Sequence, residues 1–320
     1  MTGHYPKNSL EIQAKFLQNK RHYAVSKVHL VRRRPFMKTA ALCLNVVCCF
    51  FIVIFAGCSQ SDLQGKDLPV MEKRDNFRWP DGKRAAISLT FDDARHSQIT
   101  NGVPILDEYG TKATFYVSIP NLDRGLDAWK AAAANGHEIG NHTLTHPCSG
   151  NFPFIGDRAL EDYNLDRMRH ELTESNATIE RLLDVRPVSF AYPCGQKYVG
   201  RGRNLKSYVP LVAEAFWTGR GWMDEWANDP AFCDTAQLMA MELDGKDFEQ
   251  VKQVIDRTLA NGGWLVFCGH EIAEDGRQTT RSSTLKALCE YAQDPANGLW
   301  LDTVEAITRH IRKQRTGKAG

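Results

Sequence analysis

The sequence predicts an α/β fold built on a parallel sheet, either open or closed into a barrel. Short β-branched or aromatic runs alternate with segments of helical periodicity from Trp79 to the C-terminus. The composition is that of a globular protein, since 42% of the residues are hydrophobic and 24% are charged. A chain of 320 residues is long enough for one barrel-sized domain.

Five runs are predicted as strands, because each is short, rich in β-branched or aromatic residues and close to turn residues. In chain order they are Ala85–Phe91, Thr111–Val117, Val188–Tyr192, Trp264–Cys268 and Leu299–Leu301. A further short apolar element surrounds Ile139. Apolar residues keep helical spacing from Leu165 to Leu183 and from Phe248 to Leu259, and Gly262-Gly263 is a suitable C-cap for the second helix.

The N-terminal region differs in charge from the rest of the chain. Residues 1–38 carry a formal charge of +8 and the other 282 residues carry −6, which leaves +2 overall. Thr39–Gly57 is an uncharged stretch of 19 residues directly after this basic region. Such an order is typical of a secretory signal or a signal anchor, and 19 residues are enough to span a bilayer.

Ile54–Ser59 resembles the cleavage box of bacterial lipoproteins, with small residues before Cys58 and a departure at Phe55. The resemblance implies that Cys58 is lipidated and becomes the mature N-terminus, which predicts a lipid-anchored protein of the cell envelope, outside the cytoplasmic membrane. An uncleaved anchor is the alternative. Met37 is a suitable start for such a signal peptide, so residues 1–36 are interpreted as an extension from a misassigned start codon or, alternatively, as a basic cytoplasmic tail.

The predicted organisation is therefore a basic extension (1–36), a lipoprotein signal peptide (37–57), a polar tether (58–78) and a barrel-sized domain (79–320). Five of the nine cysteines lie beyond the signal region, namely Cys148, Cys194, Cys233, Cys268 and Cys289. Their odd number and wide spacing do not indicate a disulfide framework, and no C-x-x-C motif indicates structural zinc. They are expected to be mostly buried apolar side chains, with one unspecified pair able to form a disulfide outside the cytoplasm.

Four polar clusters follow three of the predicted strands and the short apolar element around Ile139. They are Asp92-Asp93, His142 with His146, Tyr192-Pro193-Cys194-Gly195 and His270-Glu271. In parallel α/β folds, ligands and catalytic groups collect at the carboxyl ends of the strands. The sequence therefore predicts a functional site that combines these clusters.

The side chains of His142 and His146 are expected one helical turn apart, where both imidazoles can reach one cation. A third ligand is needed, and Asp92-Asp93 can supply it. Both carboxylates reach one site only if the strand has ended at this point, because adjacent side chains of a strand point to opposite faces. Two histidines at this spacing, or a solvated aspartate pair, are also common without a metal.

Three motifs resemble those of the polysaccharide deacetylases, carbohydrate esterase family 4. They are Thr90-Phe91-Asp92-Asp93, the run from His137 to Pro147, and the run from Arg186 to Gly195. The similarity covers about Ala85 to His270. It implies a single distorted (β/α) barrel of about seven strands and removal of acetyl groups from chitin, peptidoglycan, xylan or related glycans.

The resemblance also implies roles for individual residues. Asp93, His142 and His146 would bind one divalent metal ion, with Zn expected and Co, Ni or Mn as alternatives. Asp92 would be the general base and His270 the general acid. The backbone N–H of Cys194 would be the oxyanion donor. Apart from the resemblance, Tyr192 and Trp222 are predicted to contact the substrate, with Trp222, Trp217 and Trp226 forming a sugar-stacking subsite. Buried core tryptophans are an equally good account of the last three.

The chain departs from the family pattern at three places. Ala191 stands where many members have an arginine that orients the catalytic aspartate, and Arg220 or Arg203 are the candidates to replace it. Only His270 of the late Leu-x-His motif is kept. Asp92-Asp93 is followed by Ala94-Arg95-His96 instead of the usual Gly-Pro.

The function predicted from these residues is a metal-dependent glycan deacetylase with an acetylated glycan as its partner, attached to a membrane through Cys58 or a signal anchor. N-acetyl groups on amino sugars are favoured, and O-acetyl groups on xylan-type glycans are the second option. A surface glycan-binding lipoprotein with a vestigial metal site is the alternative, motivated by Ala191. An iron(II) oxygenase triad of Asp93, His142 and His146 leaves Asp92 unexplained. The mildly acidic body does not indicate a nucleic-acid binder, and no obligate protein partner is evident from the sequence.

Overall fold

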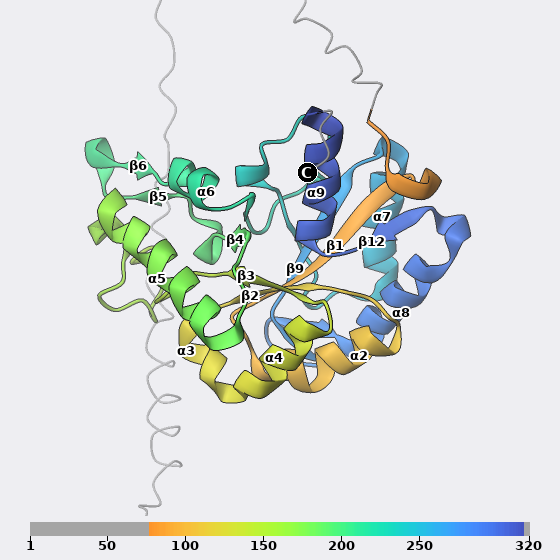
Figure 1. The fold of residues 1–320 in the computed structure, drawn as a ribbon, viewed down its shortest axis with the longest axis horizontal. Coiled ribbons are helices and arrows are strands. Elements are labelled where there is room, and N and C mark those ends of the chain that lie inside the picture. The colour runs from red at the N-terminus through yellow and green to blue at the C-terminus, as the bar shows by residue number, and fades with distance from the viewer. Residues whose placement is uncertain (1–76, 317–320) are drawn as a thin grey trace, which may run out of the picture. The chain divides into compact units, whose positions relative to one another are not determined.

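The computed structural model describes residues 77–316, which form a parallel sheet with helices on its outer side (Figure 1). The strands of this sheet are β1 (Ala85–Asp92), β2 (Thr114–Val117), β3 (Glu138–Asn141), β4 (Ser189–Ala191), β7 (Thr218–Arg220), β8 (Met241–Glu242), β9 (Trp264–Gly269) and β12 (Leu299–Leu301). Their order in space is β7-β4-β3-β2-β1-β9-β8, and β12 pairs with the beginning of β1. The predicted α/β fold is confirmed.

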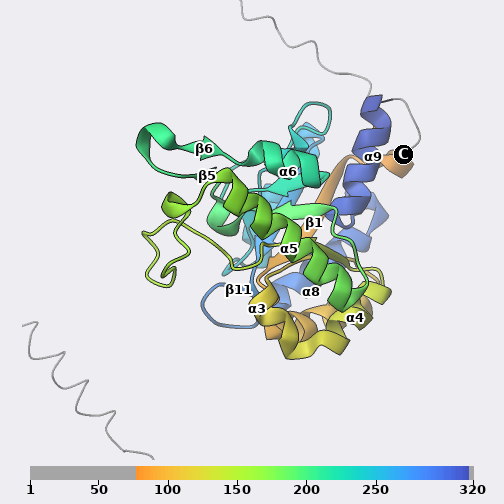
Figure 2. The same cartoon turned by 60° about the vertical axis from the view of Figure 1, so that its left-hand side comes forward.

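Helices connect the strands and cover the outside of the sheet (Figure 2). They are α2 (Val103–Glu108), α3 (Ile119–Leu122), α4 (Leu126–Ala134), α5 (Leu165–Leu183), α6 (Val209–Ala215), α7 (Phe248–Asn261), α8 (Ser282–Gln293) and α9 (Val304–Thr316). Two small two-stranded sheets lie apart from the main sheet, β5 (Tyr198–Val199) with β6 (Lys206–Ser207) and β10 (Glu271–Ala273) with β11 (Thr279–Arg281).

One short connection joins the two edges of the sheet. Leu238 forms a bridge with Arg220 at the end of β7, and its N–H and carbonyl bond to Gly219 and Gly221. The chain then enters β8, which pairs with β9 at the other edge. Because one bridge and a strand of two residues close the ring, the barrel is distorted, as the family resemblance implied.

Alternation along β1 separates the outer core from the barrel interior. Ile87, Leu89 and Phe91 belong to the large apolar cluster that includes buried residues of α2, α7 and α8. On the opposite face, Ser88 accepts a hydrogen bond from the Trp264 indole at 3.1 Å and Thr90 donates to the Phe267 carbonyl at 2.7 Å. Asp92 is the last residue of this inner row, so its carboxylate lies at the carboxyl mouth of the barrel.

The predicted strands and helices appear with small shifts of their ends. The second strand begins at Thr114, three residues later than predicted, because Thr111 lies in the turn that ends α2. The apolar element around Ile139 is β3. α7 ends at Gly262, which has φ +69° and caps the helix as expected, and Asp247 with Gln250 forms a capping box at its start.

The predictions for the extension (1–36), the signal peptide (37–57), Cys58 and nearly all of the tether fall outside the described residues. Among residues 77–316, none of the helices has the length and apolar character needed to cross a membrane.

Candidate active site

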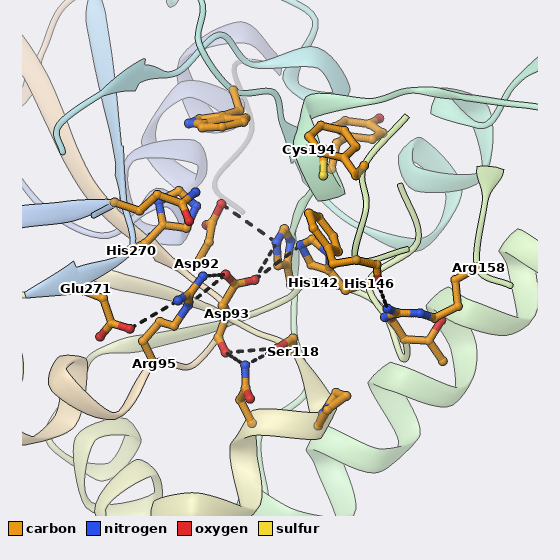
Figure 3. A pocket seen from close by; sticks show the side chains of 18 of the residues that line it. Asp92, Asp93, Arg95, Ser118, His142, His146, Arg158, Cys194, His270 and Glu271 are labelled. Carbon is orange, nitrogen blue, oxygen red and sulfur yellow. Dashed lines mark hydrogen bonds and ion pairs between the residues drawn. The ribbon is translucent and has the colours of Figure 1, made fainter. Parts of the chain in front are cut away.

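The four polar clusters meet in one cavity at the carboxyl ends of the barrel strands (Figure 3). Its volume is about 630 Å³. The predicted metal ligands, the predicted catalytic residues and two predicted substrate contacts border it, namely Asp92, Asp93, His142, His146, Tyr192, Cys194, Trp222 and His270. The expectation that the clusters combine at the strand ends is therefore confirmed in space.

The end of β1 turns two successive carboxylates toward the same cavity. β1 ends at Asp92, and Asp93 adopts φ +76°, outside strand geometry. The Asp93 N–H donates to the Tyr116 carbonyl at 3.0 Å, and its own carbonyl accepts from Ser118 and Asn121 at 3.0 and 2.9 Å. These bonds hold a backbone conformation that is costly for a residue with a side chain.

His142 and His146 converge on Asp93. The Nε2 atoms of the two imidazoles lie 3.6 and 3.4 Å from Asp93 Oδ1, and the rings are 4.8 Å apart. The expected helical turn between them is wrong: β3 ends at Asn141, and Thr143 and His146 have φ +68° and +56°. A hydrogen bond from the His146 N–H to Thr143 Oγ1 at 3.0 Å holds this loop, which brings the rings together without a helix.

The three side chains fit a divalent cation. Their ligand atoms all lie within 4.8 Å of one another. The Ala191 carbonyl is 2.9 Å from His142 Nδ1 and can only accept, so Nδ1 carries the proton and Nε2 presents its lone pair toward Asp93. Burial and the neighbouring His142 lower the pKa of His146 to about 4, which leaves a neutral imidazole at pH 7.

A network of charges determines the ionisation of both aspartates. Burial alone would raise the pKa of Asp93, but His142 and His146 lower it below the usual value. The second oxygen of Asp93, Oδ2, accepts from Arg95 at 2.9 Å, and Arg95 also lies 3.3 Å from Glu271. Arg95 belongs to the segment that departs from the family pattern, and it leaves Oδ1 to face the histidines.

Arg220 is the arginine that pairs with Asp92. Its side chain is fully buried and forms an ion pair with Asp92 Oδ1, while its Nη1 donates to the Gly221 carbonyl at 2.8 Å and to Cys268 Sγ at 3.1 Å. Burial would raise the pKa of Asp92, but Arg220 and then His142 hold it well below its usual range. Of the two candidates, Arg203 lies in an exposed turn instead.

His270 is held by a carboxylate that sequence reasoning missed. Asp244 Oδ2 lies 2.7 Å from His270 Nδ1, and Asp244 Oδ1 accepts from Thr280 at 2.8 Å. Burial lowers the pKa of His270, but the bond to Asp244 and the charge of Asp92 outweigh it and raise the pKa above 6.5. Asp244 follows β8, whose two residues are too few to give a recognisable strand pattern.

A disulfide joins Cys148 and Cys194, 46 residues apart in sequence. It links the loop that carries His146 to the turn Pro193–Gly195, in which Cys194 adopts φ +54°. The sequence left open which pair would bond. Among residues 77–316 the cysteines that remain free are Cys233, Cys268 and Cys289, two of them buried as expected.

The two predicted substrate contacts differ in exposure. Trp222 is half-buried in the cavity wall, and its ring stands edge-on to His270 at 5.8 Å. Tyr192 is 1% exposed, and its hydroxyl donates to the Ala236 carbonyl at 2.8 Å, so it supports the wall from behind. Trp217 lies beneath Arg309 and Arg312, and Trp226 borders a different cavity, so neither joins Trp222.

Known proteins with similar sequences point to the same family as the motifs that meet in the cavity. Residues 80–207 match the family model for polysaccharide deacetylase. A gellan lyase of a Bacillus species is 33% identical over 117 residues, which is 37% of this chain and 4% of that protein. A peptidoglycan-N-acetylglucosamine deacetylase of Bacillus cereus is 29% identical over 114 residues, 35% of this chain and 38% of that protein.

The matched segment thus spans well under half the length of these two relatives. Among solved structures, a Mycobacterium smegmatis protein assigned to the polysaccharide deacetylases aligns with a TM-score of 0.54 and 22% identity, over 75% of this chain and 94% of that one. This likeness supports the fold. With the family match over residues 80–207 and the three motifs gathered in one cavity, this part of the chain is a polysaccharide deacetylase domain.

Proposed function

We propose that the protein is a metal-dependent hydrolase that removes acetyl groups from a polysaccharide or oligosaccharide. N-acetyl groups on amino sugars are the favoured target, and O-acetyl groups on xylan-type glycans are the second. The observation that carries the proposal is the position of Asp92 and His270 in one cavity with the ligand set of Asp93, His142 and His146. The curated relative that acts on peptidoglycan N-acetylglucosamine supports the choice of amino sugars.

Zinc is the ion that we propose for this set, because two imidazoles and a carboxylate leave a fourth position for water or substrate. Co, Ni and Mn remain the alternatives. A divalent cation there supplies Lewis-acid activation of the acetyl carbonyl and of the attacking water. The cavity holds the sugar so that its acetyl group faces the three ligands.

The chain's own residues then move the protons. Asp92 is ionised and held in place by Arg220 through Oδ1, and its other oxygen, Oδ2, accepts a long bond of 3.4 Å from the Cys268 thiol, so Oδ2 can accept the proton of the attacking water. The Cys194 N–H stabilises the negative charge that develops on the acetyl oxygen. His270, whose raised pKa favours the protonated form, donates its proton to the departing amine or sugar oxygen.

Arg220 also bears on the alternative hypothesis of a glycan binder without turnover. That hypothesis rested on the alanine at position 191, and Arg220 supplies the missing guanidinium from the neighbouring strand. Turnover is therefore favoured. For location, we keep the proposal of a lipoprotein anchored at Cys58 in the cell envelope, where the Cys148–Cys194 disulfide would be stable.

Acetate release tests the proposal. The full-length protein, loaded with zinc, is incubated with N-acetylchitooligosaccharides and with acetylated xylan, beside the variant Asp92→Asn. We expect acetate from at least one glycan and a loss of about 10²–10⁴-fold in kcat for the variant. Glycan binding without acetate from any substrate would support the binder instead.

A further inference from the structure

Two of the arginines that border the cavity lack a carboxylate partner within the described part of the chain. Asp92 pairs with Arg220, and Arg95 lies between Asp93 and Glu271. Arg158 and Arg277 also border the cavity, and neither takes part in an ion pair with any of residues 77–316. Two guanidinium charges at the cavity are thus left without a carboxylate, although residues 58–320 carry a formal charge of −6.

Arg158 is held in position by backbone carbonyls. It lies in the loop between β3 and α5, and it donates to the carbonyls of Thr145, Phe154 and Ile155 at 2.5, 2.9 and 3.2 Å. These acceptors are neutral, so they fix the guanidinium without cancelling its charge. Three of its five N–H groups are used, which leaves donors for a ligand. A positively charged group that is already ordered loses little freedom when it binds an anion.

Aromatic side chains lie next to this arginine. Phe154 is 56% exposed, and its ring lies 5.4 Å from that of Phe152 and 6.5 Å from that of His146. Both phenylalanines border the cavity. The apolar face of a sugar ring can stack on an exposed phenyl ring at the edge of a polar cavity. Phe154 and Arg158 together form a stacking surface with a cation at its edge.

Arg277 borders the cavity on the side of His270 and Glu271. It is exposed and lies between β10 and β11, in the connection that follows His270 and Glu271. Figure 3 shows Arg158 beyond His146 on one side of Asp93, and Glu271 and His270 on the other. The two unpaired arginines therefore come from segments on opposite sides of the candidate metal ligands.

We propose that the cavity is built for an anionic glycan: the sugar next to the acetylated one carries a carboxylate that Arg158 binds while its ring stacks on Phe154. Arg277 provides a second anion contact on the opposite side. Guanidinium binds carboxylate through two parallel hydrogen bonds, which adds geometric selectivity to the attraction. This inference rests on the proposed deacetylase function and assigns its substrate class.

A matched pair of oligosaccharides tests it. One is an N-acetylated oligosaccharide with a uronic acid next to the acetylated sugar, and the other is the same compound with that carboxylate reduced to the alcohol. For the wild-type protein we expect kcat/KM to be at least about tenfold higher with the carboxylate, through a lower KM, and the preference to shrink as salt is added. Equal values for the two compounds would overturn the proposal.

Variants separate binding from support of the loop. Arg158→Gln is expected to lower kcat/KM for the acidic compound much more than for the reduced one, so that the preference collapses, with Arg277→Gln reducing it by a smaller factor. Arg203→Gln, which changes an exposed arginine away from the cavity, is the control and should keep the preference. Equal losses on both compounds in Arg158→Gln would mean that Arg158 only braces the loop.

Binding measurements keep this test independent of turnover. Calorimetric titration of the zinc-loaded Asp92→Asn protein with both oligosaccharides measures the preference even if no acetate is released. Tighter binding of the carboxylate compound supports the subsite, and equal affinity contradicts it. Absence of acetate release from the wild-type protein would count against the proposed function alone. Because Arg158→Gln can destabilise its loop, Arg158→Lys, which keeps the charge, is expected to retain part of the preference.

Discussion

Ala191 and Arg220 are register partners on the neighbouring parallel strands β4 and β7. Paired residues of parallel strands direct their side chains to the same face, so the guanidinium of Arg220 arrives where a longer side chain at position 191 would lie. An arginine one strand further along the sheet thus serves the aspartate at the end of β1. The positive charge beside Asp92 is thus supplied from position 220 instead of position 191.

Removal of Arg220 should damage both stability and activity. Arg220→Met leaves Asp92 buried without its counter-charge, which is expected to cost about 3–5 kcal/mol in the free energy of unfolding and about 10²-fold in kcat. Urea denaturation and acetate release measure the two effects. The double variant Arg220→Met, Ala191→Arg should recover part of both losses. A double variant no better than Arg220→Met would contradict the idea that the two positions are equivalent.

Loss of a ligand should remove the metal. In His146→Ala, elemental analysis is expected to give far less than one zinc per chain, with acetate release lost in parallel, because two side chains hold a catalytic zinc poorly. His96→Ala is the control, since His96 is exposed and does not border the cavity. His96→Ala should keep its zinc, and a full zinc equivalent in His146→Ala would show that the ligand assignment is wrong.

The alkaline limit of activity should depend on Asp244. The raised pKa of His270 keeps its proton to higher pH, so acid catalysis fails only as the pH rises through that value. Asp244→Asn removes the bond that raises this pKa, and the alkaline limb of the kcat/KM profile should move to lower pH, with a lower kcat. Thr280→Val, which keeps the Asp244 carboxylate and removes only the Thr280 hydroxyl bonded to it, should shift the limb less. An unmoved limb in Asp244→Asn would exclude His270 as the general acid.

The disulfide should stabilise the fold and the site together. A bridge across 46 residues is worth about 4 kcal/mol in the chain-entropy model. The double variant Cys148→Ser, Cys194→Ser is therefore expected to unfold at lower urea and to bind zinc more weakly, because Cys148 lies two residues from His146 and 3.7 Å from its ring nitrogen. Cys233→Ser, outside the cavity, is the control. Unchanged zinc affinity in the double variant would confine the role of the bridge to stability.

Much of the barrel could be predicted because its long strands carry their own pattern. β1 alternates apolar and polar residues from Ile87 onward and ends at the first of the paired aspartates, and β9 is a continuous buried run. β7 and β8 have three and two residues, which is too short for any periodicity. The two catalytic supports that they position, Arg220 and Asp244, were for that reason the least predictable parts of the site.

The remaining differences come from loop geometry and from contacts distant in sequence. The spacing of His142 and His146 is compatible with a helix, but hydrogen bonding of the loop to Thr143 and positive φ values set a different path. The pairing of Cys148 with Cys194 depends on how close β3 and β4 bring their following loops, which the sequence does not encode locally. Which of Trp217, Trp222 and Trp226 borders the cavity also depends on the tertiary fold and not on the local sequence.

His146 belongs to two overlapping donor sets, one with Asp93 and His142 and the other with Cys148 and Cys194. While the two cysteines are still thiols, the second set offers soft sulfur ligands that zinc binds strongly. Formation of the disulfide withdraws both sulfurs and leaves His146 to the first set. We therefore expect the order of disulfide formation and zinc binding to matter. A chain whose disulfide forms first should bind zinc at Asp93, His142 and His146, whereas a reduced chain should bind it at His146, Cys148 and Cys194.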